Sequence, residues 1–369
     1  MTTNLNIRNN TLDDNFQIAP LRPIDFHCHG VGSFDFAEVA NIVLDRVEKS
    51  LVADGVRAIL TLYLPEHQFN NFLELIEAYN EGRKEGRYLY IVGIALEGPI
   101  LASPGGTPKQ GVWIPTRHHW QIFSACGEKG LKYVVLSPNA DLTKHSSKTD
   151  DTYPPNVQWI VETLMDGGVS PALGHFGKKS NAEVCVRAME KILDIVANRS
   201  DKPIVTDHLF NDMPLNFKNA WRTLSAKALR ESELEELDLE NWNLKNLRER
   251  MGIVPATMIE AALAGLLKIC INFDGEHVDL AISKKTVELV GSHNLMIMTD
   301  RIQSEILAGQ RLYKCSGSSL LYQNEGIVAG GSQAIAQQIQ NMRMVGIPET
   351  DIRNIVSITP AKVLDITPY

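Results

Sequence analysis

Six residues of the types that bind metal ions in hydrolytic enzymes follow short apolar runs along this chain. They are His27, His29, Glu97, His175, His208 and Asp300, in the segments PIDFHCHG, ALEGP, LGHF, VTDHLF and MIMTD. Imidazole and carboxylate donors without a thiolate suit Zn²⁺, Fe²⁺, Mn²⁺ or Ni²⁺. We therefore expect a site for one or two divalent ions, with zinc first among them.

The two histidines of PIDFHCHG are separated by one residue. Side chains alternate between the two faces of a β-strand, so His27 and His29 point to one side and Cys28 to the other. Two imidazoles on the same side form a chelate for one ion.

Asp300 and His277 are the candidates for the chemistry itself. A bound divalent ion lowers the pKa of a water molecule towards ~7. Asp300 can accept a proton from that water and pass it to a leaving amine, as general base and then general acid. A neutral imidazole such as His277, in FDGEHVD, can polarise the scissile carbonyl. This set predicts hydrolysis of an amide or a related C–N bond.

Eight apolar, β-branched runs recur along the chain and are the predicted strands. They span 23–28, 56–62, 89–96, 131–137, 169–174, 203–207, 268–273 and 294–299. Apolar residues three and four apart predict helices between them, for example over 38–52, 181–197 and 333–345. Alternating strands and helices indicate a parallel sheet, either a (β/α)₈ barrel or a doubly wound sheet. The metal-ligand residues fall at strand ends, which favours the barrel.

The predicted barrel spans 23–369 after an N-terminal extension over 1–22, and a charged segment around 214–252 interrupts it. Its acidic part, ESELEELDLENWNLKNLRER, covers 231–250. Leucines at 234, 237, 244 and 247 recur at helical spacing, so we expect a solvated helix with one buried face. The alternative is a lid over the site or a dimer contact.

Composition excludes several classes of protein. A formal net charge of −8 argues against a nucleic-acid groove, which needs a basic stripe. No apolar run reaches the roughly 18 residues of a membrane span, and the first residues lack the features of a secretory signal. Five scattered cysteines without a CxxC pair indicate reduced thiols, so we expect a cytoplasmic protein.

The motifs as a set resemble the amidohydrolase superfamily and, within it, the N-acetylglucosamine-6-phosphate deacetylases. The resemblance runs from about 23 to 366 through PIDFHCHG, ALEGPIL with PKQGVW, LGHF, DHLFNDMP, FDGEHVD, MIMTD, AGGSQAI and SITPAKVLDI. It implies a (β/α)₈ barrel, a homodimer, and removal of an N-acetyl group from an amino sugar or its phosphate.

The resemblance also implies roles for individual residues. One ion would be held by Glu97, His175 and His208. His27 and His29 would complete a second site with Asp300. The substrate would be contacted by His277, while Asn211 and Asp212 would line the sugar pocket.

The sequence departs from the family pattern at positions that would recognise the substrate. The flanking β-sandwich of the family is expected to be absent or vestigial here. Trp113 stands in GVW where the family tends to have G-A-H, and Lys218 and Arg222 stand where a phosphate-binding Arg is expected. Two substrate classes therefore stay open. One is an N-acetyl amino sugar, and the other is a compound with a different C–N bond, such as an N-formyl group, a cyclic amide or a nucleobase that is deaminated. A non-catalytic scaffold is the third reading.

The turn Gly330-Gly331-Ser332 also has two readings. Gly331 and Ser332 can offer backbone N–H groups to an anionic part of the substrate. Alternatively, Ser332 is the N-cap of the helix over 333–345.

Overall fold

The computed structural model describes residues 22–142, 155–218 and 224–368. Its main sheet has eight strands in chain order, and each is parallel to its neighbours. They are β1 (Ile24–Cys28), β4 (Arg57–Leu62), β5 (Ile91–Glu97), β6 (Leu131–Leu136), β7 (Ser170–Leu173), β8 (Ile204–His208), β9 (Leu267–Ile271) and β10 (Leu295–Ile297). All eight predicted strands are confirmed, each within a few residues of its predicted ends.

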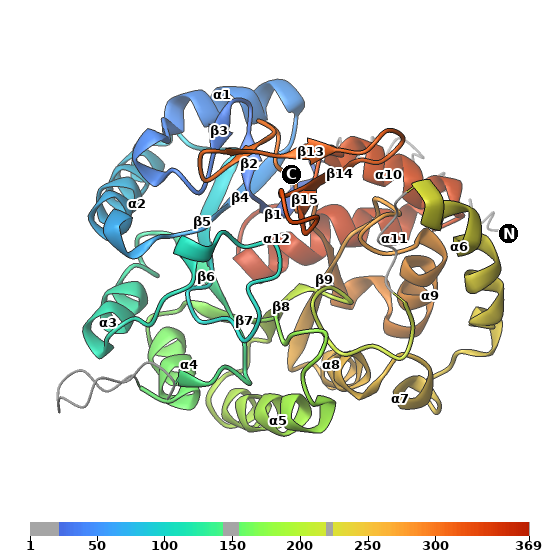
Figure 1. Ribbon diagram of the computed structural model, residues 1–369. Coiled ribbons are helices and arrows are strands. Elements are labelled where there is room, and N and C mark those ends of the chain that lie inside the picture. The colour runs from blue at the N-terminus through green and yellow to red at the C-terminus, as the bar shows by residue number, and fades with distance from the viewer. Residues whose placement is uncertain (1–21, 143–154, 219–223, 369) are drawn as a thin grey trace, which may run out of the picture.

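The ring closes between its first and last strands. Asp300 N–H donates to His27 O at 3.0 Å, and His29 N–H donates to Arg301 O at 2.9 Å. The sheet is therefore a (β/α)₈ barrel and not an open, doubly wound sheet. The helices surround it in Figure 1.

Helices follow the strands around the barrel. They are α1 (Leu44–Asp54), α2 (Phe69–Lys84), α3 (Arg117–Ala125), α4 (Val157–Asp166), α5 (Ala182–Arg199), α8 (Ile253–Leu263), α9 (Leu280–Val290), α10 (Ile335–Met344), α11 (Glu349–Arg353) and α12 (Thr359–Leu364). Asn156 and Asn181 cap α4 and α5 by accepting from the backbone N–H three residues on, which satisfies donors that a helix start leaves unpaired.

The barrel lumen is packed with side chains. Its cluster draws on every strand of the ring and includes Phe26, Ile59, Ala95, Tyr133, Val135, Ala172, Val205, Cys270 and Met296. A larger cluster lies between the outer faces of the strands and the helices, and Cys28 belongs to it. Because the lumen is filled, polar chemistry is confined to the strand ends and the loops above them.

The charged segment forms three short helical pieces and not one helix. These are α6 (Leu224–Glu236), a 3₁₀ helix (Leu239–Asn241) and α7 (Leu247–Arg250). The chain breaks at Asp238, whose φ of 51° is left-handed. Leu247 is buried as predicted, but Leu244 is 51% exposed, so the prediction of one continuous apolar face is wrong.

The buried Arg230 fastens α6 to the barrel. Its Nε donates to Asp279 Oδ2 at 2.9 Å, next to the start of α9, and Nη2 donates to the same oxygen. The segment is thus anchored to the loop that carries His277.

The remaining strands in the described ranges form small antiparallel sheets. They pair β2 (Gly30–Val31) with β3 (Phe34–Asp35), β11 (Ile306–Leu307) with β12 (Gln310–Arg311), and β13 (Tyr313–Lys314) with β14 (Leu320–Tyr322) and β15 (Val328–Gly331). Within those ranges these small sheets do not form a separate β-sandwich. In the same part of the chain, no helix has the length and apolar character of a membrane span.

Candidate metal centre

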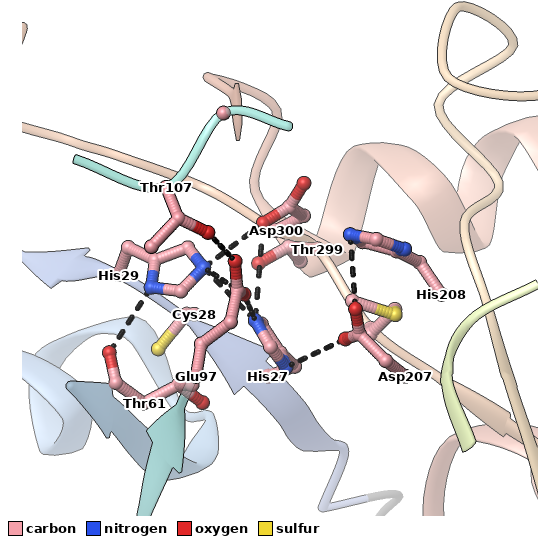
Figure 2. A network of polar contacts seen from close by, with 12 residues as sticks. His27, Cys28, His29, Thr61, Glu97, Thr107, Asp207, His208, Thr299 and Asp300 are labelled. Atoms are coloured by element: carbon pink, nitrogen blue, oxygen red, sulfur yellow. Dashed lines mark hydrogen bonds and ion pairs between the residues drawn. The ribbon is translucent and has the colours of Figure 1, made fainter. Parts of the chain in front are cut away.

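The six predicted ligand residues converge at one end of the barrel, where a seventh, Asp207, joins them. They form two groups that share Glu97: His27, His29, Glu97 and Asp300, and Glu97, His175, Asp207 and His208. Within each group the candidate ligand atoms all lie within 4.8 Å of one another. No residue of either group is more than 4% exposed. Figure 2 shows the chelating pair of β1 beside Glu97, with Asp207 and His208 next to them.

The first group is built around the chelate of β1. His27 Nε2 lies 2.9 Å from His29 Nε2 and 3.0 Å from Glu97 Oε2. Asp300 Oδ1 is 3.2 Å from His29 Nε2. The two histidines therefore face the same point, as strand alternation predicted.

In the second group, Glu97 comes from the end of β5 and His175 follows β7. The other two residues, Asp207 and His208, come from β8. His175 Nε2 is 3.1 Å from Glu97 Oε1 and 3.2 Å from Asp207 Oδ2. His208 Nε2 is 3.1 Å from the same Asp207 oxygen. Asp207 is not among the predicted ligands. It directly precedes His208, and in a regular strand two consecutive side chains point to opposite faces. The signal available was the carboxylate itself, in VTDHLF.

Outer contacts orient the ligands. His29 Nδ1 lies 3.1 Å from Thr61 O, and His175 Nδ1 lies 3.1 Å from Ser103 O. A backbone carbonyl only accepts, so each Nδ1 carries the proton and each Nε2 can present its lone pair to the centre. Thr107 Oγ1 donates to Glu97 Oε1 at 2.6 Å. Thr107, like Ser103, comes from the loop after β5.

That loop lies directly over the centre. An added Cβ on Gly105 would be 3.2 Å from the His175 ring, and one on Gly106 would be 2.4 Å from Val328 O. Gln323 Nε2 donates to Gly106 O at 2.6 Å. The glycines let the backbone pass between the ligands and the β14–β15 hairpin, which excludes water from the ligands below.

Unpaired buried atoms fit a divalent cation. His175 Nε2 and both carboxylate oxygens of Asp207 make no hydrogen bond among the described residues. Burial would lower the pKa of His29, but Glu97 and Asp300 raise it to about 10. Burial also opposes ionisation of Glu97, yet His175 and His29 hold the pKa of its carboxyl well below the usual range. Carboxylates that hold nearby imidazoles in charged form can equally hold a metal ion after those protons leave.

Two of the site residues have strained backbones. His175 has φ 49° and Asp300 has φ 50°, a left-handed conformation that side chains with a Cβ rarely adopt. Asp25 fixes the approach to Asp300, because its carboxylate accepts from Thr299 N–H at 3.0 Å and from Thr299 Oγ1 at 2.5 Å. The strain and its support indicate that Asp300 is held in one position.

His277 lies against Asp300. Its Nδ1 is 2.5 Å from Asp274 Oδ2, and its Nε2 is 3.3 Å from Asp300 Oδ2. Burial would lower the pKa of His277, but Asp274 and Asp300 raise it to about 10. In the site without metal these carboxylates therefore favour the charged ring, whereas the neutral imidazole predicted from the sequence concerns the site with its metal.

The predicted pocket residues around DHLFNDMP are close to the centre. Asp212 is buried, with Oδ2 3.5 Å from His175 Nδ1. Asn211 is half-buried, and its Oδ1 accepts from Asp212 N–H at 3.1 Å. Asp212 thus orients the ligand His175. The sequence predicted only that Asp212 lines the sugar pocket.

Trp113 and the glycine turn have other partners. Trp113 Nε1 donates to Leu64 O at 2.8 Å, and its ring lines a cavity of about 420 Å³ that no metal-ligand residue borders. Gly331 N–H donates to Asp300 O at 2.7 Å, and Ser332 N–H donates to Ser319 O. These donors are taken, so the expected backbone anion site is wrong. The N-cap of α10 is Ala334, so the alternative role for Ser332 is wrong as well.

The two cations expected to read a phosphate do not both fall in the described ranges. Lys218 is exposed and is paired with Glu233. Arg222 lies outside the described residues.

Comparisons with known proteins identify the fold. No family model and no curated protein sequence matches the chain. Among solved structures, N-acetylglucosamine-6-phosphate deacetylase from Pasteurella multocida matches with a TM-score of 0.66 and 16% identity, over 94% of this chain and 76% of that one. The enzymes from Mycobacterium smegmatis and Thermotoga maritima match with TM-scores of 0.61, at 18% and 15% identity, over 94% of this chain and 78% of each of theirs. The chain therefore has the barrel fold of these deacetylases.

Proposed function

We propose that this protein is a metal-dependent hydrolase that removes an N-acyl group, most simply N-acetyl, from an amino sugar or amino sugar phosphate. The observation that carries the proposal is the convergence of His27, His29, Glu97, His175, His208 and Asp300 in two buried groups around one shared carboxylate. The fold is that of deacetylases, one of which was solved in complex with N-acetyl-D-glucosamine-6-phosphate. Zinc, a homodimeric assembly and a cytoplasmic location belong to the same proposal.

The residues present fit one or two divalent ions. Glu97, His175 and His208 would hold one, and His27 and His29 with Asp300 would hold a second. Such an ion supplies Lewis acidity, which makes water more acidic and polarises a carbonyl.

Asp300 is the proposed proton carrier. Burial would raise the pKa of its carboxyl, but contacts with His277 and His29 hold that pKa below the usual range. It is therefore ionised at neutral pH and able to accept a proton from the attacking water. Held in the first ligand group between His29 and His277, it can then deliver this proton to the amine nitrogen as the C–N bond breaks.

His277 is the proposed partner of the acyl oxygen or of a sugar hydroxyl. Asp274 holds its Nδ1, so the ring presents Nε2 towards Asp300. An N–H donor at this point stabilises negative charge that develops on an oxygen during attack. Asn211 is the proposed contact for the sugar ring, as the family resemblance implies. It directly precedes Asp212, whose carboxylate lies beside the ligand His175.

The test is a substrate panel on protein loaded with Zn²⁺ or Mn²⁺. It contains N-acetylglucosamine, N-acetylglucosamine 6-phosphate, an N-formyl amino sugar and a cyclic imide, and it measures free acid and free amine. We expect acetate release that stops with chelator and returns with metal. Turnover of only the formyl or imide substrate would move the assignment to another C–N bond. Less than a tenth of an equivalent of metal, with no turnover, would favour the scaffold reading.

A further inference from the structure

The backbone of β8 is irregular where it reaches the metal centre. Val205 pairs with Lys268 and His208 with Cys270, so three steps along β8 match two along β9. Cys270 N–H donates to Thr206 Oγ1 at 2.9 Å instead of to the ladder. A bulge of this kind breaks the alternation of side chains. It allows the consecutive residues Asp207 and His208 both to face the centre.

The buried carboxylate of Asp207 is surrounded by imidazoles and makes no hydrogen bond among the described residues. The residue is 1% exposed, and neither oxygen makes a hydrogen bond among the described residues. Its nearest polar neighbours are imidazole nitrogens: His208 Nε2 at 3.1 Å, His175 Nε2 at 3.2 Å and His27 Nδ1 at 3.4 Å. A buried carboxylate is costly unless it is paired, hydrogen-bonded or bound to a metal.

We propose that Asp207 is a metal ligand that completes a closed set of four protein donors with Glu97, His175 and His208. This inference rests on the proposed metal dependence and deepens it. One cation placed among these four side chains would satisfy the Asp207 oxygens and the unpaired His175 Nε2 together. In VTDHLF the bulge provides the extra carboxylate beside the histidine ligand.

A closed set of four donors has a functional consequence. Sites with four protein ligands retain their ion without help from solvent, whereas catalytic sites keep a position open. The Asp207 group would then hold its ion firmly. The other group also has four protein donors, and what sets it apart is the proposed proton carrier Asp300, whose Oδ2 lies 3.3 Å from His277 Nε2. Asp207 also links the groups, since His27 offers Nδ1 to Asp207 and Nε2 to the first group.

The test compares metal binding by Asp207→Asn and Asp212→Asn. Both variants remove one charge from a buried carboxylate beside His175, but only Asp207 faces its Nε2. Competition dialysis with Zn²⁺ measures the number and affinity of bound ions. We expect two ions in the unchanged protein and loss of more than about 100-fold in the affinity for one of them in Asp207→Asn. Asp212→Asn should lose less, within the ~10–100-fold typical of outer contacts. Two ions bound with unchanged affinity by Asp207→Asn would overturn the proposal.

A second measurement does not depend on the variant folding. Crystals of the unchanged protein grown with Zn²⁺ should place an Asp207 oxygen about 2.0–2.2 Å from an anomalous peak. The ligand role would be rejected if both Asp207 oxygens lay farther than about 3 Å from every ion, which is longer than any Zn–O bond. These readouts are independent of turnover. A protein that binds metal through Asp207 but hydrolyses no substrate of the panel would refute the proposed function alone.

Discussion

Replacing Asp300 with asparagine isolates the proton-transfer role in the proposed reaction. The change keeps the shape of the side chain but removes the charge of a carboxylate whose Oδ1 lies 3.2 Å from His29 Nε2 and whose Oδ2 lies 3.3 Å from His277 Nε2. Proton transfer by a positioned group contributes about 10²–10⁴-fold to a rate. Because both transfers pass through Asp300, we expect kcat/KM to fall by at least ~10³-fold. That loss corresponds to about 4 kcal/mol of transition-state stabilisation, at about 1.36 kcal/mol for each tenfold change.

The assay has to separate loss of the base from loss of metal. Acetate release is measured on protein whose metal content is determined in the same sample, with saturating Zn²⁺ in the buffer. Glu48→Gln is the matched control, since it also removes a buried carboxylate charge but contacts the start of β5, at the opposite end of that strand from Glu97. Activity of Asp300→Asn within tenfold of the unchanged enzyme, with metal retained, would refute the role assigned to Asp300.

Three further predictions follow from the contacts. His277→Asn removes the N–H donor held by Asp274 and should lower kcat about 10²–10³-fold without changing the metal content measured by mass spectrometry; loss of metal instead would make His277 a ligand. Because the pKa of His29 without metal is about 10, its proton must leave when a metal binds, so the apparent metal affinity should rise with pH up to that value. Titration calorimetry in two buffers with different ionisation enthalpies measures this proton release. Equal heats in the two buffers would contradict the prediction. Glu48 accepts from the backbone N–H groups of Leu89, Tyr90 and Ile91 at 2.8–2.9 Å, so Glu48→Gln should lower the free energy of unfolding in urea by about 1–3 kcal/mol while kcat stays unchanged; an unchanged unfolding midpoint would show that these bonds are replaced by water.

The apolar runs were enough to predict the barrel strands. Parallel strands buried on both faces need continuous apolar, β-branched segments, and such segments stand out in a single sequence. The candidate ligands could then be found because a barrel gathers its strand ends at one face. This reasoning holds for His27 and His29, which face the same point on either side of Cys28, although β1 is itself irregular against β4 between Asp25 and Cys28.

Asp207 shows where local geometry stops being sufficient. Its direction depends on a bulge in β8, which exists only through the pairing of β8 with β9. Thr107 reaches Glu97, and Asp274 holds His277, through loops whose paths are set by their packing on distant segments. None of these contacts leaves a periodic signal in the sequence.

The failed predictions have the same origin. Gly331 and Ser332 have the composition of an anion-binding turn, but the tertiary structure directs their N–H groups to backbone carbonyls. Leu244 fits a helical repeat, yet the chain breaks at Asp238 before the repeat is complete. The sequence by itself determined the strands and the types of ligand at their ends, because strand burial and alternation are local. Only the tertiary structure decided which carboxylates meet which imidazoles, because that depends on strand register and on loops fixed by long-range packing.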